Sequence, residues 1–206
     1  MWGLVQDGSI TEIINKPKGM VIGDTRHSRK IFYLWSEAER NAVGLYEVIF
    51  DNSNKKDEGY YNNTNQTFAF ADGVITASYG SPTAKALADT LFTAQDEIDG
   101  KGTEGEVAVR GLKTKHKEII KRQASGLLAP TDWYVIKATD VAEYNVPSAV
   151  STFRANVRTR SNEMETAIDN ANDVDALATL YAYVNTGTEE NPVYERPLGE
   201  FPTLEV

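Results

Sequence analysis

The residues able to carry out acid–base or metal chemistry are few in this chain and lie far apart. It has two histidines, His27 and His116, and no cysteine. A metal site needs several ligands at one place, and a catalytic Asp-His-Ser group needs three side chains brought together in space. We therefore expect His27 to lie in a loop and His116 to be a surface or boundary residue of a basic helix, with no metal ion, no cofactor and no catalytic residue.

Two clusters of acidic or polar residues are further candidates for chemistry. Asp96, Glu97 and Asp99 stand at the end of a predicted helix, beside the glycine-rich break 100–105. Catalytic carboxylate pairs need a defined separation and unlike surroundings, so we interpret these three residues as a solvated face. The polar segment 51–66 has the residue types of a calcium loop but not its regular ligand spacing. We expect an exposed loop there.

A basic helix followed by two aromatic residues has the residue types that stack nucleic-acid bases. Lysines and arginines line the predicted helix 106–128, and Trp133 and Tyr134 follow it. The whole chain, however, carries a net charge of −9, and phosphate binding relies on clustered positive charge. We predict no binding to nucleic acid or to an anionic membrane. The lysines are then a solvated face, and the aromatic pair anchors the helices.

Residues 1–80 show the pattern of a small β-rich domain. Asp7-Gly8 and Asp72-Gly73 each stand between apolar runs, which is a strong hairpin signal because these residues tolerate positive φ. Ser36, with Glu39 three residues further on, has the spacing of a capping box at the start of a short helix. Further strands are predicted over residues 20–22, 31–35 and 45–50.

The hydrophobic period changes from two to 3.6 after Gly80, and we place a domain boundary there. Helices are predicted over 83–99 and 106–128, from Thr131, from Pro147 to about residue 170, and from Asn172 or Asp173 to Val184. Opposite charges on the first two would favour their antiparallel packing. The predicted fold class is α+β. It comprises a β-rich domain (1–80), an α-helical hairpin or bundle (81–185) and an extended acidic C-terminal arm (186–206).

Aromatic and arginine side chains, which dominate many protein interfaces, are concentrated in the stretch 127–158. Thr131 has the position of a helix N-cap, and Arg154 and Arg158 are neighbours on one helix because they lie four residues apart. The candidate partner contacts are Trp133, Tyr134, Arg154, Arg158 and Phe201 of the arm. Trp133 is alternatively an internal residue, and we favour that role: it would hold the helices together while the arginines face a partner.

The N-terminus does not have the pattern of a secretory signal. Asp7 and Glu12 interrupt it, and no long apolar run follows. No stretch reaches the roughly 20 apolar residues needed to span a bilayer. The absence of cysteine fits assembly in a reducing compartment.

Two stretches resemble proteins encoded in tailed-phage genomes. Residues 34–48, Leu-Trp-Ser-Glu-Ala-Glu-Arg-Asn-Ala-Val-Gly-Leu-Tyr-Glu-Val, are similar to an acidic helix and Gly-Leu-Tyr element of phage tail-associated proteins. Residues 127–134, Leu-Leu-Ala-Pro-Thr-Asp-Trp-Tyr, together with Pro147, Phe153, Arg154 and Arg158, resemble the phage tail-assembly-chaperone-like family. The two stretches cover about a quarter of the chain. The sequence departs from the family pattern at Phe153, where tyrosine is usual, and at Lys137, in a region where arginine is usual.

The resemblance implies a structural component of a tailed-phage virion, in the tail, neck or fibre attachment, assembled in the host cytoplasm. Its implied partners are other tail, neck or fibre proteins and further copies of itself in a symmetric assembly. A tail or tail-fibre assembly chaperone that leaves before maturation is the alternative. A carbohydrate-binding or hydrolytic domain using Trp2, Trp35 and Tyr60-Tyr61 is a third hypothesis from another class, without paired carboxylates to support it.

Overall fold

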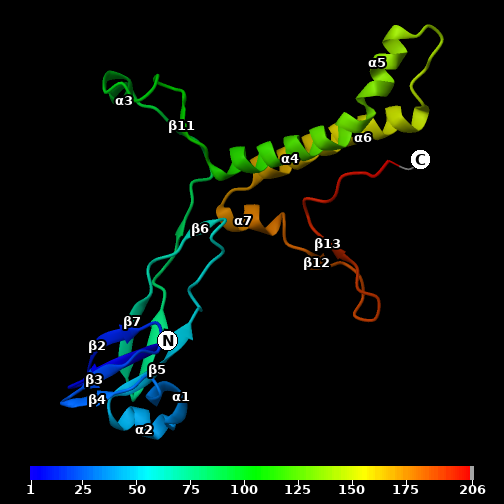
Figure 1. The fold of residues 1–206 in the computed structure, drawn as a ribbon. Coiled ribbons are helices and arrows are strands. Elements are labelled where there is room, and N and C mark those ends of the chain that lie inside the picture. The colour runs from blue at the N-terminus through cyan, green and yellow to red at the C-terminus, as the bar shows by residue number, and fades with distance from the viewer. Residues whose placement is uncertain (205–206) are drawn as a thin grey trace. The chain divides into compact units, whose positions relative to one another are not determined.

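The computed structural model describes residues 1–204 and divides the chain into two compact units, Met1–Thr83 and Ala84–Val206. The first unit is β-rich and the second is mainly helical (Figure 1). The fold class is α+β, as predicted.

The N-terminal unit is built on a five-stranded sheet of order β2-β1-β5-β8-β7. Strands β5 and β8 are parallel, and the other neighbours are antiparallel. The strands of this sheet are β1 (Trp2–Gln6), β2 (Ser9–Ile14), β5 (Leu45–Asp51), β7 (Thr67–Ala71) and β8 (Val74–Ser78). The smaller elements are β3 (Met20–Ile22), β4 (Thr25–His27), α1 (Ile31–Leu34), α2 (Glu37–Ala42), β6 (Tyr61–Asn62) and, at the unit boundary, β9 (Thr83–Ala84).

Tight turns set the register of this sheet, and both predicted hairpins are confirmed. In the β1–β2 turn φ is 51° at Asp7 and 74° at Gly8, and in the β7–β8 turn it is 52° at Asp72 and 77° at Gly73. Positive φ at both central positions matches the right-handed twist of the flanking strands.

The short helix α2 begins and ends as the sequence predicts. The Ser36 hydroxyl accepts from the N–H of Glu39, and the Glu39 carboxylate accepts from the N–H of Ser36 at 2.7 Å. The helix is followed by Gly44, where φ is +80° and an added Cβ would lie 2.3 Å from the carbonyl oxygen of Val5. Only glycine fits this close approach.

The predicted strand over residues 31–35 is wrong, because residues Ile31–Leu34 form helix α1. Ile31 and Phe32, which are adjacent in sequence, are both buried, whereas Tyr33 and Leu34 are exposed. A strand would bury alternate residues, and a single helical turn can bury a neighbouring pair.

The sheet packs apolar side chains on both faces. Leu4 belongs to a cluster with Phe32 of α1 and Leu45, whereas the next residue, Val5, belongs to a cluster with Ile75. Successive strand residues point to opposite faces, so the two clusters lie on opposite sides of the sheet.

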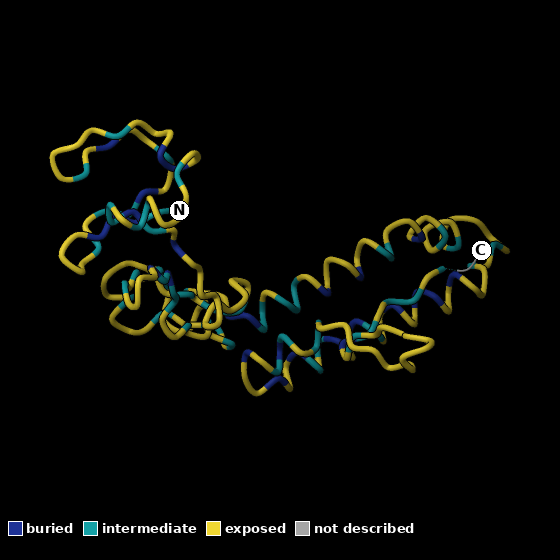
Figure 2. Tube along the Cα trace, turned by 90° about the horizontal axis from the view of Figure 1, so that it is seen from below, coloured by how far each residue is buried: buried dark blue, intermediate teal, exposed yellow. Residues whose placement is uncertain are grey.

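In the C-terminal unit, helices α4 and α6 lie side by side and α5 lies at one end of the pair (Figure 1). The helices are α3 (Ala94–Ile98), α4 (Leu112–Leu128), the 3-10 turn η1 (Ala129–Thr131), α5 (Asp132–Asp140), α6 (Ser148–Asn170) and α7 (Val174–Thr179). Its strands form two short antiparallel pairs, β10 (Thr90–Leu91) with β11 (Val107–Val109), and β12 (Val184–Asn185) with β13 (Tyr194–Glu195). Buried positions recur at helical intervals on the facing sides of α4 and α6 (Figure 2).

The predicted helix over residues 83–99 is wrong, and so is the predicted packing of that helix on the next one. This segment holds β9, β10 and only the short helix α3, and α4 begins at Leu112 instead of residue 106. The amide N–H of Leu112 donates to the carbonyl of Ala86 at 2.9 Å, and that of Lys113 to Leu87 at 3.1 Å. The chain before α4 therefore gives its carbonyls to the first turn of α4 rather than to a helix of its own.

The start of α4 is also capped by a carboxylate from this preceding segment. Asp89 accepts from the N–H of Gly111 at 2.7 Å and from the hydroxyl of Thr114 at 2.9 Å. These two hydrogen bonds hold the pKa of Asp89 below its usual value. A Cβ on Gly111 would lie 2.3 Å from the carbonyl oxygen of Ala88, so the close approach of the two segments requires glycine.

Candidate functional site

A buried arginine joins α6 to the turn between α4 and α5. One terminal nitrogen of Arg154 donates to the carbonyl of Leu128 at 3.0 Å and also to the hydroxyl of Thr131. The same nitrogen lies 2.8 Å from a carboxylate oxygen of Asp132. The residue is 9% exposed. We call Arg154, Leu128, Thr131 and Asp132 the arginine latch.

Thr131 belongs to this latch and does not cap α5, contrary to the prediction. Its hydroxyl makes no capping hydrogen bond and donates to the carbonyl of Leu128 at 2.7 Å. The Leu128 carbonyl thus accepts from two side chains at the point where α4 ends. Because the latch includes Asp132, the first residue of α5, it fixes where that helix begins.

Helix α5, held in this way, exposes a set of large apolar side chains. Trp133 is 50% exposed and Ile136 is 60% exposed, and Val135 and Val141 are exposed as well. The rings of Trp133 and Tyr134 lie 3.8 Å apart between centroids. The ammonium group of Lys137 lies 4.4 Å from the ring centroid of Tyr144 and 5.8 Å from that of Trp133. We call residues 133–144 the α5 cap.

The roles predicted for Trp133 and Arg154 are reversed in the structure. Trp133 does not hold the helices together, because half of its surface is exposed. Arg154 holds them and is not displayed on the surface. Arg158 is exposed, and its only hydrogen bond in the described part of the chain is a 3.5 Å contact with the carbonyl of Arg154. Partner binding by Trp133, Tyr134 and Arg158 stays a prediction.

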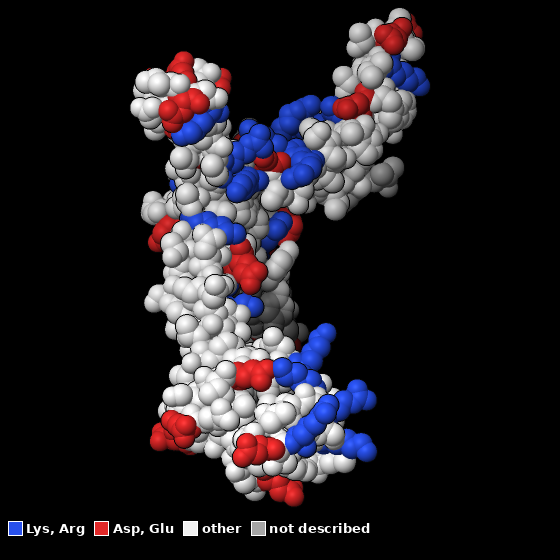
Figure 3. Space-filling view, turned by 60° about the vertical axis from the view of Figure 1, so that its left-hand side comes forward, with Lys and Arg blue, Asp and Glu red and all other residues white. Residues whose placement is uncertain are grey.

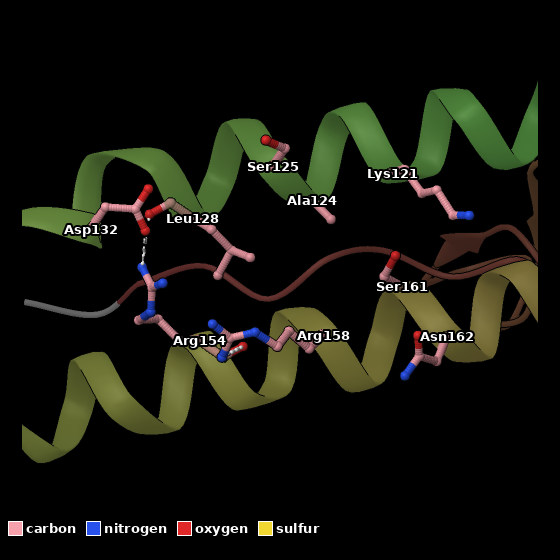
Figure 4. Close-up of a pocket in the computed structure, with 9 residues that line it drawn as sticks. All are labelled: Lys121, Ala124, Ser125, Leu128, Asp132, Arg154, Arg158, Ser161 and Asn162. Carbon is pink, nitrogen blue, oxygen red and sulfur yellow. Dashed lines mark hydrogen bonds and ion pairs between the residues drawn. The ribbon is translucent and has the colours of Figure 1, made fainter. Parts of the chain in front are cut away.

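An open groove runs between α4 and α6 beside the arginine latch (Figure 4). It has a volume of about 450 Å³. Its floor is formed by Ala124 and Leu128, and Lys121 and Arg158 stand along it with Ser125 and Ser161. The groove therefore combines a small apolar floor with polar edges that carry the cations Lys121 and Arg158 and also the carboxylate of Asp132.

The C-terminal arm covers the other flank of the same helix pair. Phe201 and Leu204 pack against the cluster of Ala124, Phe153 and Val157. Phe201 thus contacts its own chain in this structure, and its predicted contact with a neighbour stays untested.

Arg160 fastens the arm to α6. Its guanidinium donates to the carbonyls of Leu198 and Glu200, each at 3.1 Å. The amide of Leu198 in turn donates to the carbonyl of Leu180 at 2.9 Å, and the Leu198 side chain is buried. Gly199 has φ of +72°, and a Cβ there would lie within the Arg160 guanidinium, 1.4 Å from a nitrogen. Arg160 and Gly199 were not singled out from the sequence, since only the fold brings them together.

The carboxylates of the acidic cluster Asp96, Glu97 and Asp99 make hydrogen bonds and ion pairs with residues nearby in the sequence. Asp96 accepts from the N–H and the hydroxyl of Thr93, and these hydrogen bonds, with Lys101, lower the pKa of Asp96 to about 2. Asp99 pairs with Lys101 at 2.9 Å, and Glu97 accepts from the N–H of Glu104. Asp96 caps the start of α3 together with Thr93. The three carboxylates therefore do not have the unlike environments that a catalytic carboxylate pair needs.

The two histidines belong to different units, and each lies against an aromatic ring. His27 lies in strand β4 and not in a loop, so that prediction is wrong, and its ring is 5.3 Å from that of Trp35 between centroids. The corresponding distance from His116 to Tyr181 is 4.8 Å, and burial lowers the pKa of His116. Within residues 1–204 there is no group of three or more His, Asp or Glu residues that could hold a metal ion.

The basic side chains of α4 are only partly a solvated face. Lys117 pairs with Asp169 at 2.8 Å and Lys121 with Glu165 at 3.3 Å, so both join α4 to α6. Lys and Arg side chains gather along the helical unit (Figure 3). Arg122 is exposed and makes no hydrogen bond or ion pair in the described part of the chain.

Comparisons with known proteins add no identification. No protein-family model, curated protein or solved structure matches this chain. In residues 1–204, no helix combines the length and the apolar character that crossing a bilayer requires.

Proposed function

We propose that this chain is a non-enzymatic structural component of a tailed-phage virion, in the tail, neck or fibre attachment. It acts through contacts with other virion proteins. The observation that carries the proposal is the α5 cap, which presents Trp133, Val135 and Ile136 to solvent at one end of the helix pair.

Exposed groups of large apolar side chains mark interaction surfaces in soluble proteins. Tryptophan and tyrosine are also enriched among the residues that contribute most to binding. The arginine latch supports the same role, because a pinned helix loses less conformational entropy when it binds. The resemblance of residues 34–48 to phage tail-associated proteins, and of residues 127–158 to the phage tail-assembly-chaperone-like family, suggests the kind of assembly, and the α5 cap and latch lie in the second stretch.

Mass spectrometry of virions purified from cells that produce this protein tests the proposal. Stoichiometric amounts in the mature particle are expected of a structural component. Presence in assembly intermediates together with absence from mature particles would overturn it in favour of the assembly chaperone.

A variant with Trp133→Ala and Ile136→Ala gives a second readout. It should reduce incorporation into particles while leaving the thermal unfolding of the isolated protein nearly unchanged, because both side chains are exposed. The matched control is Ile119→Ala, which removes another exposed apolar side chain, on α4, outside the α5 cap. Equal loss of incorporation in the control would contradict a role for the cap.

A further inference from the structure

The α4–α6 pair has two flanks, and only one of them is covered. On the covered flank, Phe201 and Leu204 of the arm pack beside Phe153. On the open flank, Arg154, Arg158 and Ser161 of α6 line the groove, and they share a face because they follow one another at intervals of four and three residues. Of the three, Arg158 is exposed and the other two are buried. The groove on this open flank is large enough to hold a segment of peptide.

The charges along the open groove are unequal. Arg154 is neutralised by Asp132 at 2.8 Å, and Lys121 by Glu165 at 3.3 Å. Arg158 has no acidic partner among residues 1–204, although the chain as a whole carries a net charge of −9. Figure 4 shows its guanidinium lying in the groove between the two helices. The groove therefore holds one uncompensated cation beside the apolar floor of Ala124 and Leu128.

We infer that this groove binds a short extended segment of a partner protein, in which an aspartate or glutamate stands beside an apolar residue. The carboxylate pairs with Arg158, and the apolar side chain rests on Ala124 and Leu128. A guanidinium can bind a carboxylate through two parallel hydrogen bonds. This inference rests on the proposed function, because the bound segment would belong to another protein of the same virion assembly.

The dimensions of the groove limit the length of the segment. It follows α4 from Lys121 to Leu128, and at 1.5 Å per residue this is roughly 10 Å. An extended chain advances about 3.3 Å per residue, so the groove accommodates about three residues. Ser125 at its edge offers a hydroxyl group to the backbone of the segment, whereas the Ser161 hydroxyl donates to Glu165 at 3.2 Å.

Fluorescence anisotropy on the full chain tests the inference directly. The probe is a fluorescein-labelled peptide Gly-Glu-Leu-Glu-Gly, and the neutral control probe is Gly-Gln-Leu-Gln-Gly. We expect saturable binding of the acidic probe that weakens as salt is raised, because the contact is electrostatic. Equal binding of the neutral probe would overturn the inference.

Two variants place the binding in the groove. Arg158→Glu should weaken the acidic probe about tenfold or more, as expected for loss of a charge-assisted hydrogen bond. Ser125→Trp should block the groove sterically without changing a charge. The matched control is Arg122→Glu, which makes the same change of charge on an exposed arginine of α4 outside the groove and should leave binding nearly unchanged. Equal loss in the control, or no loss in Arg158→Glu, would overturn the inference.

Two further measurements separate other occupants. Single-stranded oligothymidine should bind more weakly than the acidic probe, and tighter binding that depends on Arg158 would overturn the peptide assignment. Sedimentation should show a chain whose association state is the same with and without Arg158→Glu. Self-association abolished by that substitution would instead assign the groove to a second copy. Virion mass spectrometry is independent of all these outcomes, so failure of the proposed function and failure of this inference can be told apart.

Discussion

The N-terminal unit is held by apolar side chains on a regular sheet, whereas the C-terminal unit adds to its apolar helix core single polar side chains that reach distant backbone groups. In the sheet, Leu45 and Ile75 are fully buried, and the turns close over two residues. In the helical unit, Arg154 donates to a carbonyl 26 residues away and Arg160 to one 38 residues away.

Because of this difference, a substitution should affect different amounts of the surrounding structure in the two units. A cavity in the sheet removes one contribution among many neighbouring ones, so its cost follows the volume lost. Loss of a long-range polar contact releases a whole segment, such as the start of α5 or the arm. Substitutions in the two units should therefore differ in which amides become exchangeable as well as in their energies.

The largest expected effect is in the sheet. Ile75→Ala should lower the free energy of unfolding by about 2–5 kcal/mol, because the side chain is fully buried between β5 and β7. Hydrogen exchange followed by mass spectrometry should show faster exchange throughout residues 1–83 and little change in residues 84–204. The control is Val74→Ala at a partly exposed neighbour. Faster exchange in both units would contradict a separation of their stabilities.

Arg154→Met should have the next largest effect and lower the free energy of unfolding by about 3 kcal/mol. It leaves the Leu128 carbonyl with one donor fewer and leaves Asp132 without its partner. Amide exchange should rise most in η1 and α5. Trp133→Ala, at an exposed position, should change stability far less. If Trp133→Ala were the more destabilising of the two, the assignment of the latch to Arg154 would be wrong.

Gly199→Ala should destabilise by about 1–3 kcal/mol, because φ is positive there and the new Cβ would displace the Arg160 guanidinium. The arm should become sensitive to proteolysis while α4 and α6 stay protected. Gly126→Ala provides the control, since it lies in α4 with no atom near the added Cβ. That change should stabilise the helix by about 0.5–1 kcal/mol. An arm that stays protected in Gly199→Ala would show that Arg160 does not fasten it.

The smallest expected effect is a dependence of stability on pH that arises from Asp89. The folded chain lowers the pKa of Asp89 from 3.8 by hydrogen bonds from Gly111 and Thr114. A lowered pKa stabilises the fold above the unfolded value and loses this contribution as pH falls through the folded value. Asp89→Asn should therefore be less stable than the parent at pH 7, with the difference shrinking below about pH 4. Thermal unfolding across this range measures it, and a difference independent of pH would exclude the carboxylate charge as the cause.

The parts of the fold that the sequence predicts correctly depend on residues within a few positions of one another. The Asp7-Gly8 and Asp72-Gly73 turns and the Ser36–Glu39 capping box are of this kind, as is Asp173, which caps α7. Each of these features depends on residues no more than three positions apart in the sequence.

The parts that the sequence does not predict depend on contacts far along the chain. Residues 83–99 have an apolar period suited to a helix, but the carbonyls of Ala86 and Leu87 bond the first turn of α4. Similarly, hydrophobicity predicts that Trp133 is internal and Arg154 external, whereas Trp133 is half exposed and Arg154 donates from the facing helix to the carbonyl at the end of α4. Thr131, Asp132 and Arg154 all lie in the stretch 127–158, which is rich in aromatic and arginine residues, but their types and spacing do not predict their mutual contact.

The arm that covers one flank of the helix pair also has a consequence for synthesis. Residues 198–204 leave the ribosome after every helix that they contact, because α4, α6 and α7 all precede them in the chain. Until they arrive, Phe153 and its apolar neighbours stand open to solvent, and Arg160 lacks the two carbonyls that it binds later. The nascent helical unit therefore passes through a period in which both flanks are accessible, and residues 198–204 then cover one of them.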